Sequence, residues 1–190
     1  MANYRLRTGP RRWQRAALTI ALALTLLLPA LPGAAQAEPS CSGTAPVSDD
    51  LASAAMGLTR GELDALYGAG DATQTGWNWA FDGFDLLQSN CNLILTIDPA
   101  SEYANPANAQ ELVRLLLPED AQAAGTWQFG TLQSPPQDAA LWISSDLDDR
   151  FKAMGEPYLG QILVLATYNG DAYNPGAIIR IEIRAAPIPG

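Results

Sequence analysis

The sequence contains no histidine. Its absence excludes the Ser-His-Asp and Cys-His catalytic mechanisms, zinc sites built on histidine and a histidine pH switch. The sequence also lacks the G-x-S-x-G turn, the phosphate-binding P-loop and the dinucleotide-binding G-x-G-x-x-G. No EF-hand calcium loop is present. Among enzymes, a hydrolase that works with carboxylates alone stays open as an alternative.

Basic residues are few, and several of them lie together at the start of the chain. The sequence has 11 Lys and Arg against 20 Asp and Glu. An uncharged apolar run over 16–31 follows five arginines, and Ala35-Gln36-Ala37 comes next. This order predicts a secretory signal peptide over 1–37, cleaved after Ala37. An uncleaved N-terminal anchor is the alternative, but the apolar run is short for a membrane span. The five arginines are Arg5, Arg7, Arg11, Arg12 and Arg15.

Cleavage after Ala37 would leave a strongly acidic secreted or extracytoplasmic protein. Because five of the 11 basic residues would be removed, the mature chain would carry a net charge of about −14. Nucleic acid and anionic membranes attract clusters of positive charge, so neither is expected as a partner. The acidic balance favours solubility outside the cell. Cation binding and docking onto a basic partner are the alternatives.

The two cysteines, Cys41 and Cys91, both follow the expected cleavage site. An even number of cysteines in an exported chain predicts a disulfide. The bridge would close a loop of about 50 residues and would contribute about 4 kcal/mol in the chain-entropy model. It would tie an extended leader over 38–52 to the domain that follows. Two free thiols are the alternative.

Local patterns predict short helices. Thr59 and Glu62 form a capping box at a helix start, with Leu58 and Leu63 beside them as a hydrophobic staple. Asn108 is expected to cap a second helix, and Ser144 or Ser145 a third that runs to Met154. The second helix would end at Pro118. Its apolar stripe would be Leu112, Leu115 and Leu116, and the third helix would bury Leu147, Phe151 and Met154.

Alternating and continuous apolar segments predict the strands, and Asp82-Gly83 predicts a hairpin turn. No long helical crossover separates every pair of strands, so we expect an α+β fold: short helices packed on an antiparallel sheet in a single compact domain. The domain would span 53–185, with a turn over 155–160 and a tail over 186–190. A capped helix precedes a hairpin in both halves. The expected strands are 77–81, 84–88, 92–98, 125–132, 162–168 and 179–184.

The first helix also carries a family resemblance. Gly57-Leu58-Thr59-Arg60-Gly61-Glu62-Leu63, followed by Gly68, resembles the helix that opens the repeats of the β-lactamase-inhibitor-protein-like and small outer-membrane-assembly lipoprotein (SmpA-like) group. The resemblance implies an exported protein with helices on an antiparallel sheet and a binding role. The inhibitors bridge cysteines within each repeat, whereas Cys41 precedes the helix here. The rest of the chain resembles small secreted proteins of high-GC bacteria.

Acidic and aromatic residues supply the candidate sites. Asp146, Asp148 and Asp149 lie where a helix is expected to start, so their carboxylates suit the helix dipole better than a calcium site. Aromatic residues alternate along two expected strands, where they form either core or, on an uncovered face, a surface that binds a protein or sugar. These candidate binding residues are Trp77, Trp79, Phe81, Trp127 and Phe129.

Taken together, these patterns predict a secreted, non-catalytic, acidic binding module. It would recognise a protein or a cell-envelope component such as the cell wall. We expect no catalytic residue, no metal ligands, no cofactor and no membrane span after cleavage. The alternatives are a small carboxylate-dependent hydrolase and a structural envelope protein. A pocket with two carboxylates would favour the hydrolase, and an open apolar face would favour the binding module.

Overall fold

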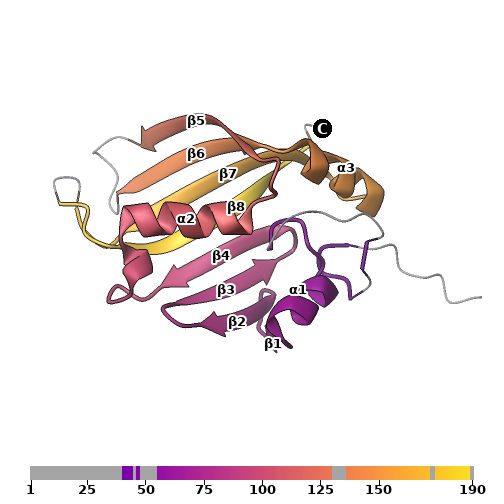
Figure 1. Cartoon of the computed structure of the whole chain (residues 1–190), viewed down its shortest axis with the longest axis horizontal. Helices are drawn as coiled ribbons and strands as arrows, with labels where there is room; N and C mark the ends of the chain where they lie inside the picture. The colour runs from indigo at the N-terminus through magenta and orange to yellow at the C-terminus, as the bar shows by residue number, and fades with distance from the viewer. Residues whose placement is uncertain (1–39, 45, 48–54, 130–135, 172–173, 189–190) are drawn as a thin grey trace, which may run out of the picture. The chain divides into compact units, whose positions relative to one another are not determined.

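Eight strands form one antiparallel sheet in the computed structural model of the chain, which describes residues 40–44, 46–47, 55–129, 136–171 and 174–188 (Figure 1). The strand order is β1-β2-β3-β4-β8-β7-β6-β5, so two four-stranded meanders meet where β4 pairs with β8. The strands are β1 (Asp71–Ala72), β2 (Trp77–Phe81), β3 (Phe84–Ser89), β4 (Asn92–Ile97), β5 (Gln122–Phe129), β6 (Gln137–Ile143), β7 (Tyr158–Tyr168) and β8 (Ile178–Pro187).

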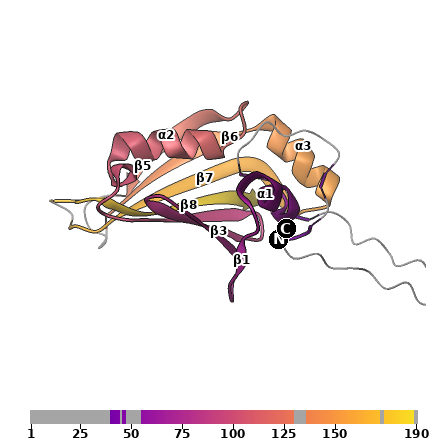
Figure 2. The same cartoon turned by 60° about the horizontal axis from the view of Figure 1, so that its bottom comes forward.

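Three α-helices and one turn of 3-10 helix complete the α+β fold, as expected. They are α1 (Arg60–Tyr67), η1 (Glu102–Ala104), α2 (Pro106–Leu116) and α3 (Ser145–Met154). Figure 2 shows all three α-helices on the same face of the sheet. Their buried residues and those of the sheet form one core cluster, so residues 55–188 build one compact domain. None of the helices in the described residues is long and apolar enough to cross a membrane.

The strand register assigns side chains to the two faces of the sheet. Leu86 pairs with Trp79 and with Leu95, and Leu95 pairs with Ile181. These four residues are buried beneath the helices, and we call their face the helix side. Because side chains alternate along a strand, the residues directly before and after each of these four lie on the opposite face. This second face, which we call the helix-free face, carries the paired row Asn78, Leu87, Ile94, Glu182, Leu165 and Ala139.

Helix α1 begins as its sequence predicts. The Thr59 hydroxyl accepts from the Glu62 amide at 3.3 Å, and a Glu62 carboxylate oxygen accepts from the Thr59 amide at 2.7 Å. Leu58 and Leu63 are both buried. The helix ends at Gly68, whose carbonyl accepts a hydrogen bond from the Trp79 indole at 2.8 Å. The capping box therefore fixes where α1 starts, and Trp79 holds its end against the sheet.

Helix α2 begins earlier than expected, which corrects the prediction that Asn108 caps it. Asn105 is the cap: its side-chain oxygen accepts from the Ala107 amide at 2.9 Å. Pro106 then takes the first helical position, where the missing N–H costs nothing. The apolar stripe is also shifted, since Leu115 is 68% exposed. The buried residues are spaced at helical intervals and are Ala109, Leu112, Val113 and Leu116.

Helix α3 agrees with its predicted cap and buried residues. The Ser144 hydroxyl accepts from the Leu147 amide at 3.0 Å, and Leu147, Phe151 and Met154 are buried. Gly155 ends the helix with a φ of 69°, a left-handed conformation that glycine adopts without strain. The buried residues also include Arg150, which the sequence pattern does not predict.

Several strand boundaries differ from those expected. Strand β5 begins at Gln122 instead of 125, and β1 and β6 are not among the expected strands. Strand β7 begins at Tyr158, inside the predicted turn over 155–160. Strand β8 runs to Pro187, beyond the expected domain boundary at 185. The reason is pairing: Tyr158 pairs with Pro187, and the Ile188 amide donates to the Pro157 carbonyl at 2.9 Å. The predicted signal peptide over 1–37 lies outside the described residues, as do positions 48–52 of the leader.

Cys41 and Cys91 form the predicted disulfide. Both cysteines are buried, and the Cys41 carbonyl accepts from the Arg60 amide at 2.9 Å. The bridge joins the segment before α1 to the turn between β3 and β4, and the Arg60–Cys41 hydrogen bond joins the same segment to the first turn of α1.

Candidate functional site

Three of the five predicted binding aromatics lie in β2, on the helix side. Trp79 is only 4% exposed, so it belongs to the core. Phe81 is half-buried between Tyr67 and Phe84, with ring centroids 5.1 and 4.8 Å away. The Arg60 guanidinium lies 4.7 Å from the centroid of the Trp77 ring. Burial places Trp79 in the core, whereas Trp77 and Phe81 keep part of their surface exposed, so a binding role for these two stays a prediction.

The other two predicted aromatics lie in β5. Trp127 pairs with Ala139, and Phe129 pairs with Gln137. Their side chains are outside the described part of the structure, so their role in binding stays a prediction.

The helix-free face carries aliphatic side chains that the sequence analysis did not single out. Leu87, Ile94 and Leu165 are half-buried within the paired row across the sheet. Leu141 pairs with Leu163 on the same face, and both are half-buried. Ile143 is 48% exposed. No described helix covers this face (Figure 2). Its aliphatic side chains therefore form a partly exposed surface on strands β3, β4, β6 and β7.

Acidic and basic residues are nearly equal in number on the helix-free face. Glu182 lies at the centre and forms ion pairs with Arg180 and Arg184, which lie two residues away on each side in β8. Asp85 is exposed in β3. Asp71 in β1 pairs with Asn78 and is also exposed on this face. These three acids and two bases are the charged residues that the strand alternation puts on this face among the described residues. The face is thus close to neutral in a chain that has 20 acidic and 11 basic residues.

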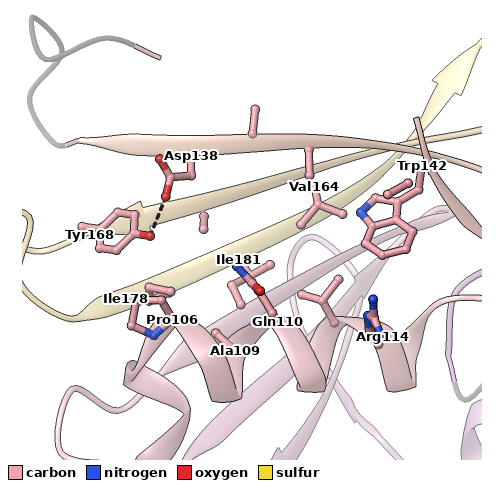
Figure 3. A pocket seen from close by; sticks show the side chains of 15 residues that line it. Pro106, Ala109, Gln110, Arg114, Asp138, Trp142, Val164, Tyr168, Ile178 and Ile181 are labelled. Atoms are coloured by element: carbon pink, nitrogen blue, oxygen red, sulfur yellow. Dashed lines mark hydrogen bonds between the residues drawn. The ribbon is translucent and has the colours of Figure 1, made fainter. Parts of the chain in front are cut away.

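A cavity of about 510 Å³ lies on the helix side, between α2 and the second meander (Figure 3). Its size falls in the range of about 300–1,000 Å³ that is typical of small-ligand sites. Helix α2 forms one wall, and strands β6, β7 and β8 form the other. Most lining residues are apolar, and small alanines of the sheet leave the space open. Its apolar walls include Val113, Ala140, Val164, Ala166, Ile178 and Ile181.

Polar groups lie at both ends of this cavity. At one end, the Tyr168 hydroxyl donates to the Asp138 carboxylate at 2.7 Å. Burial and this hydrogen bond raise the pKa of Tyr168 far above its ordinary value, so the phenol stays protonated. At the other end Figure 3 shows Trp142 and Arg114. Among the described residues that line the cavity, Asp138 is the one carboxylate.

The acidic residues around the start of α3 are engaged in caps and ion pairs. Asp148 and Asp149 both pair with Lys152, at 2.6 and 3.3 Å. Asp120 lies at the helix N-terminus, where its carboxylate accepts four hydrogen bonds. These come from the Ser144 hydroxyl at 2.5 Å, the Ser145 amide at 2.7 Å, the Ser145 hydroxyl at 3.0 Å and the Asp146 amide at 3.1 Å. This arrangement satisfies helix amides with a negative charge.

Asp120 is expected to make the stability of the fold depend on pH. Burial raises the pKa of Asp120, but the hydrogen bonds that it accepts outweigh this effect and lower the pKa below its ordinary 3.8. Ionised Asp120 therefore stabilises the fold above the pKa of the unfolded chain, and this contribution is lost as pH falls through the folded value. The difference in unfolding free energy between wild type and Asp120→Asn should be largest near pH 6 and should shrink towards pH 2.

Urea unfolding at a series of pH values measures this difference. Asp71→Asn is the matched control, because Asp71 is an exposed carboxylate in β1. The unfolding free energy of Asp71→Asn should follow that of the wild type from pH 6 to pH 2. A constant difference between wild type and Asp120→Asn from pH 6 to pH 2 would contradict the prediction.

One group of described residues has the spacing of a metal site. The Cys41 and Cys91 sulfurs and a Glu156 carboxylate oxygen lie within 4.8 Å of one another. The two sulfurs are joined in the disulfide, so neither is available as a thiolate ligand. The Glu156 carboxylate instead accepts from the Cys41 amide at 3.2 Å.

Comparisons with protein-family models, with curated proteins and with solved structures gave no match.

Proposed function

We propose that this chain is an exported, non-catalytic binding protein that recognises another protein through the helix-free face of its sheet. The observation that carries the proposal is the partly exposed aliphatic surface formed by Leu87, Ile94 and Leu165 with Leu141 and Leu163. Partly exposed aliphatic side chains gathered on one face of a folded domain are typical of interaction sites. Export is supported by the basic and apolar N-terminal segment and by the disulfide.

The chemistry of the face favours a protein over a cell-wall polysaccharide. Sugar rings stack on open aromatic faces, and the described aromatics of β2 lie on the helix side instead. Aliphatic side chains around a balanced set of charges suit a protein surface, whose interface core is apolar and whose rim is polar. The Glu182 ion pairs would then help to fix the orientation of the partner. A structural envelope role and a hydrolase remain alternatives of other classes.

The test replaces aliphatic surface on this face by charge without removing core residues. Ile94 and Leu165 both lie opposite Glu182 in the register, so lysines at these positions can pair with it. The Ile94→Lys/Leu165→Lys variant should fold and should lose its partner, with a fall in retained protein of at least about tenfold, because a desolvated charge at an interface core opposes binding.

The matched control is Leu66→Lys/Leu115→Lys, which makes the same change of charge at two exposed leucines in α1 and α2. Each variant and the wild type would be immobilised and exposed to the exported proteins and, separately, to the cell-wall fraction of the source cell. A protein retained by wild type and control but not by the face variant supports the proposal. Equal retention by all three chains, retention of wall polysaccharide alone, or an empty eluate counts against it.

A further inference from the structure

The cavity beneath α2 lies on the helix side, so it is separate from the face proposed to bind a protein. It has an unusual cation at one end. In the described residues, Arg60, Arg150, Lys152, Arg180 and Arg184 each form an ion pair with a carboxylate. Arg114 lines the cavity from α2, is exposed, and has no such pair among the described residues. In an acidic chain, an unpaired guanidinium at the edge of a cavity is suited to an anionic group.

A second donor lies at the same end. The Trp142 indole N–H is buried and has no hydrogen-bond partner among the described residues. Pro106 of α2 and Asp138 of β6 lie at one end of the cavity (Figure 3). Arg114 of α2 and Trp142 of β6 lie at the other end. A buried N–H without a partner costs free energy, and an acceptor from a ligand would remove that cost. Two donors therefore face the same end of the cavity.

The rest of the cavity is suited to an alkyl chain. Val113 and Val164 line its middle, and Ile178 and Ile181 continue the apolar wall. Four alanines of the sheet line the cavity and leave space along α2; they are Ala123, Ala139, Ala140 and Ala166. At the far end the Asp138 carboxylate, with the Tyr168 hydroxyl bound to it, would repel an anion. An anionic head is therefore favoured only at the Arg114 end.

We propose that this cavity binds a long-chain carboxylate, a free fatty acid, with its head group at Arg114 and Trp142 and its alkyl chain along α2 towards Ile178. The guanidinium pairs with the carboxylate through charge-assisted hydrogen bonds. The indole N–H donates a further hydrogen bond to the same head group. Burial of methylene groups against the apolar walls supplies the affinity, and the cavity volume of about 510 Å³ limits the length of the chain.

The experiment titrates the oxidised full chain with palmitate and follows binding by calorimetry. Hexadecanol has the same alkyl chain without the charge, and octanoate has the charge with a shorter chain. Palmitate is expected to bind saturably, and both other ligands at least about tenfold more weakly, since one lacks the ion pair and the other lacks eight methylenes.

Two variants separate the head-group site from the alkyl site. Arg114→Gln keeps a polar side chain but removes the charge, and should weaken palmitate about tenfold while leaving hexadecanol unchanged. Ala166→Leu fills the cavity and should weaken both ligands. Arg184→Gln is the matched control: it removes one exposed cation from the other face and should leave palmitate affinity within about twofold of wild type.

Several outcomes would overturn the assignment. These are absence of saturable palmitate binding, equal affinity for palmitate and hexadecanol, and an Arg114→Gln variant that binds palmitate as the wild type does. Hexadecyl phosphate binding more tightly than palmitate would overturn the choice of a carboxylate head group. Because the face variants of the protein-binding test leave the cavity intact, each proposal can fail without the other.

Discussion

Replacing Arg150 by methionine is expected to lower the free energy of unfolding by about 3–5 kcal/mol. This is the usual cost of removing one partner of a buried ion pair, because the other charge stays buried without its counter-charge. The Arg150 side chain is only 2% exposed, and its Nε donates to the Gly57 carbonyl at 2.8 Å. Its Nη2 pairs with the Glu62 carboxylate. Arg150→Met would leave that carboxylate half-buried without its counter-charge. Urea unfolding followed by tryptophan fluorescence measures the loss.

Glu62 explains why the effect should be large. Its carboxylate also accepts from the Thr59 amide in the capping box and from the Val47 amide at 3.3 Å. Burial raises the pKa of Glu62, but the hydrogen bond and charge of Arg150, with the Thr59 contacts, outweigh burial and lower it. Without Arg150 the pKa of Glu62 should rise. One carboxylate therefore joins α1, α3 and the segment before α1.

A double-mutant cycle isolates the pair. Glu62→Gln keeps an acceptor for the Thr59 amide but removes the charge, so adding it to Arg150→Met should recover part of the lost stability. Arg184→Met is the control for loss of an exposed arginine and should cost less than about 1 kcal/mol. An Arg150→Met chain within about 1 kcal/mol of the wild type would show that the ion pair contributes no more than a surface pair does.

Removing the disulfide with Cys41→Ala/Cys91→Ala is expected to destabilise the fold by about 4 kcal/mol. The bridge spans a sequence separation of 50 residues, and opening it returns that loop entropy to the unfolded chain. The midpoint of urea unfolding should fall accordingly. Limited proteolysis should also cleave near positions 40–47 faster, because the segment would lose its covalent link and would be held by hydrogen bonds to α1 and to Glu156 and by the packing of Val47.

Chemical reduction of the wild type provides the control for this variant. The reduced chain and Cys41→Ala/Cys91→Ala should unfold at closely similar urea concentrations, since both lack the same constraint. An alanine variant as stable as the oxidised wild type would contradict the prediction. A reduced wild type that is much less stable than the alanine variant would instead assign the loss to burying free thiols.

Features set by neighbouring residues could be predicted from the sequence. The capping box of α1, the cap and buried residues of α3, and the Asp82-Gly83 turn each depend on residues within a few positions. Helix α2 shows the limit of such reasoning. Asn105 and Asn108 are both good cap residues, and the proline after Asn105 fixes the helix start.

Features set by distant residues could not be predicted in the same way. Arg150 resembles a surface residue of a short helix, and its partner Glu62 lies 88 positions earlier. Gln88 is likewise polar and only 2% exposed, and its amide donates to the Leu58 carbonyl at 2.8 Å. Neither pairing leaves a local pattern in the sequence.

The aromatic residues show what strand alternation can and cannot predict. Alternation along a strand separates two faces but does not say which face the helices will cover. Trp79 is the better core residue because it buries a large ring and satisfies its indole N–H at Gly68. Leu87 and Ile94 lie on the helix-free face, a placement that follows from the strand register and from the side on which the helices pack.

The pairing of β4 with β8 also bears on how the chain folds. Within each meander, neighbouring strands are close in sequence and can pair early. The junction is different: Leu93 pairs with Ile183 and Thr96 with Arg180, across most of the domain. Because closing so long a loop is slow, the two halves are expected to form before they join. Until then the edges of β4 and β8 stay open, and a partly folded chain would be most prone to aggregation at these two strands.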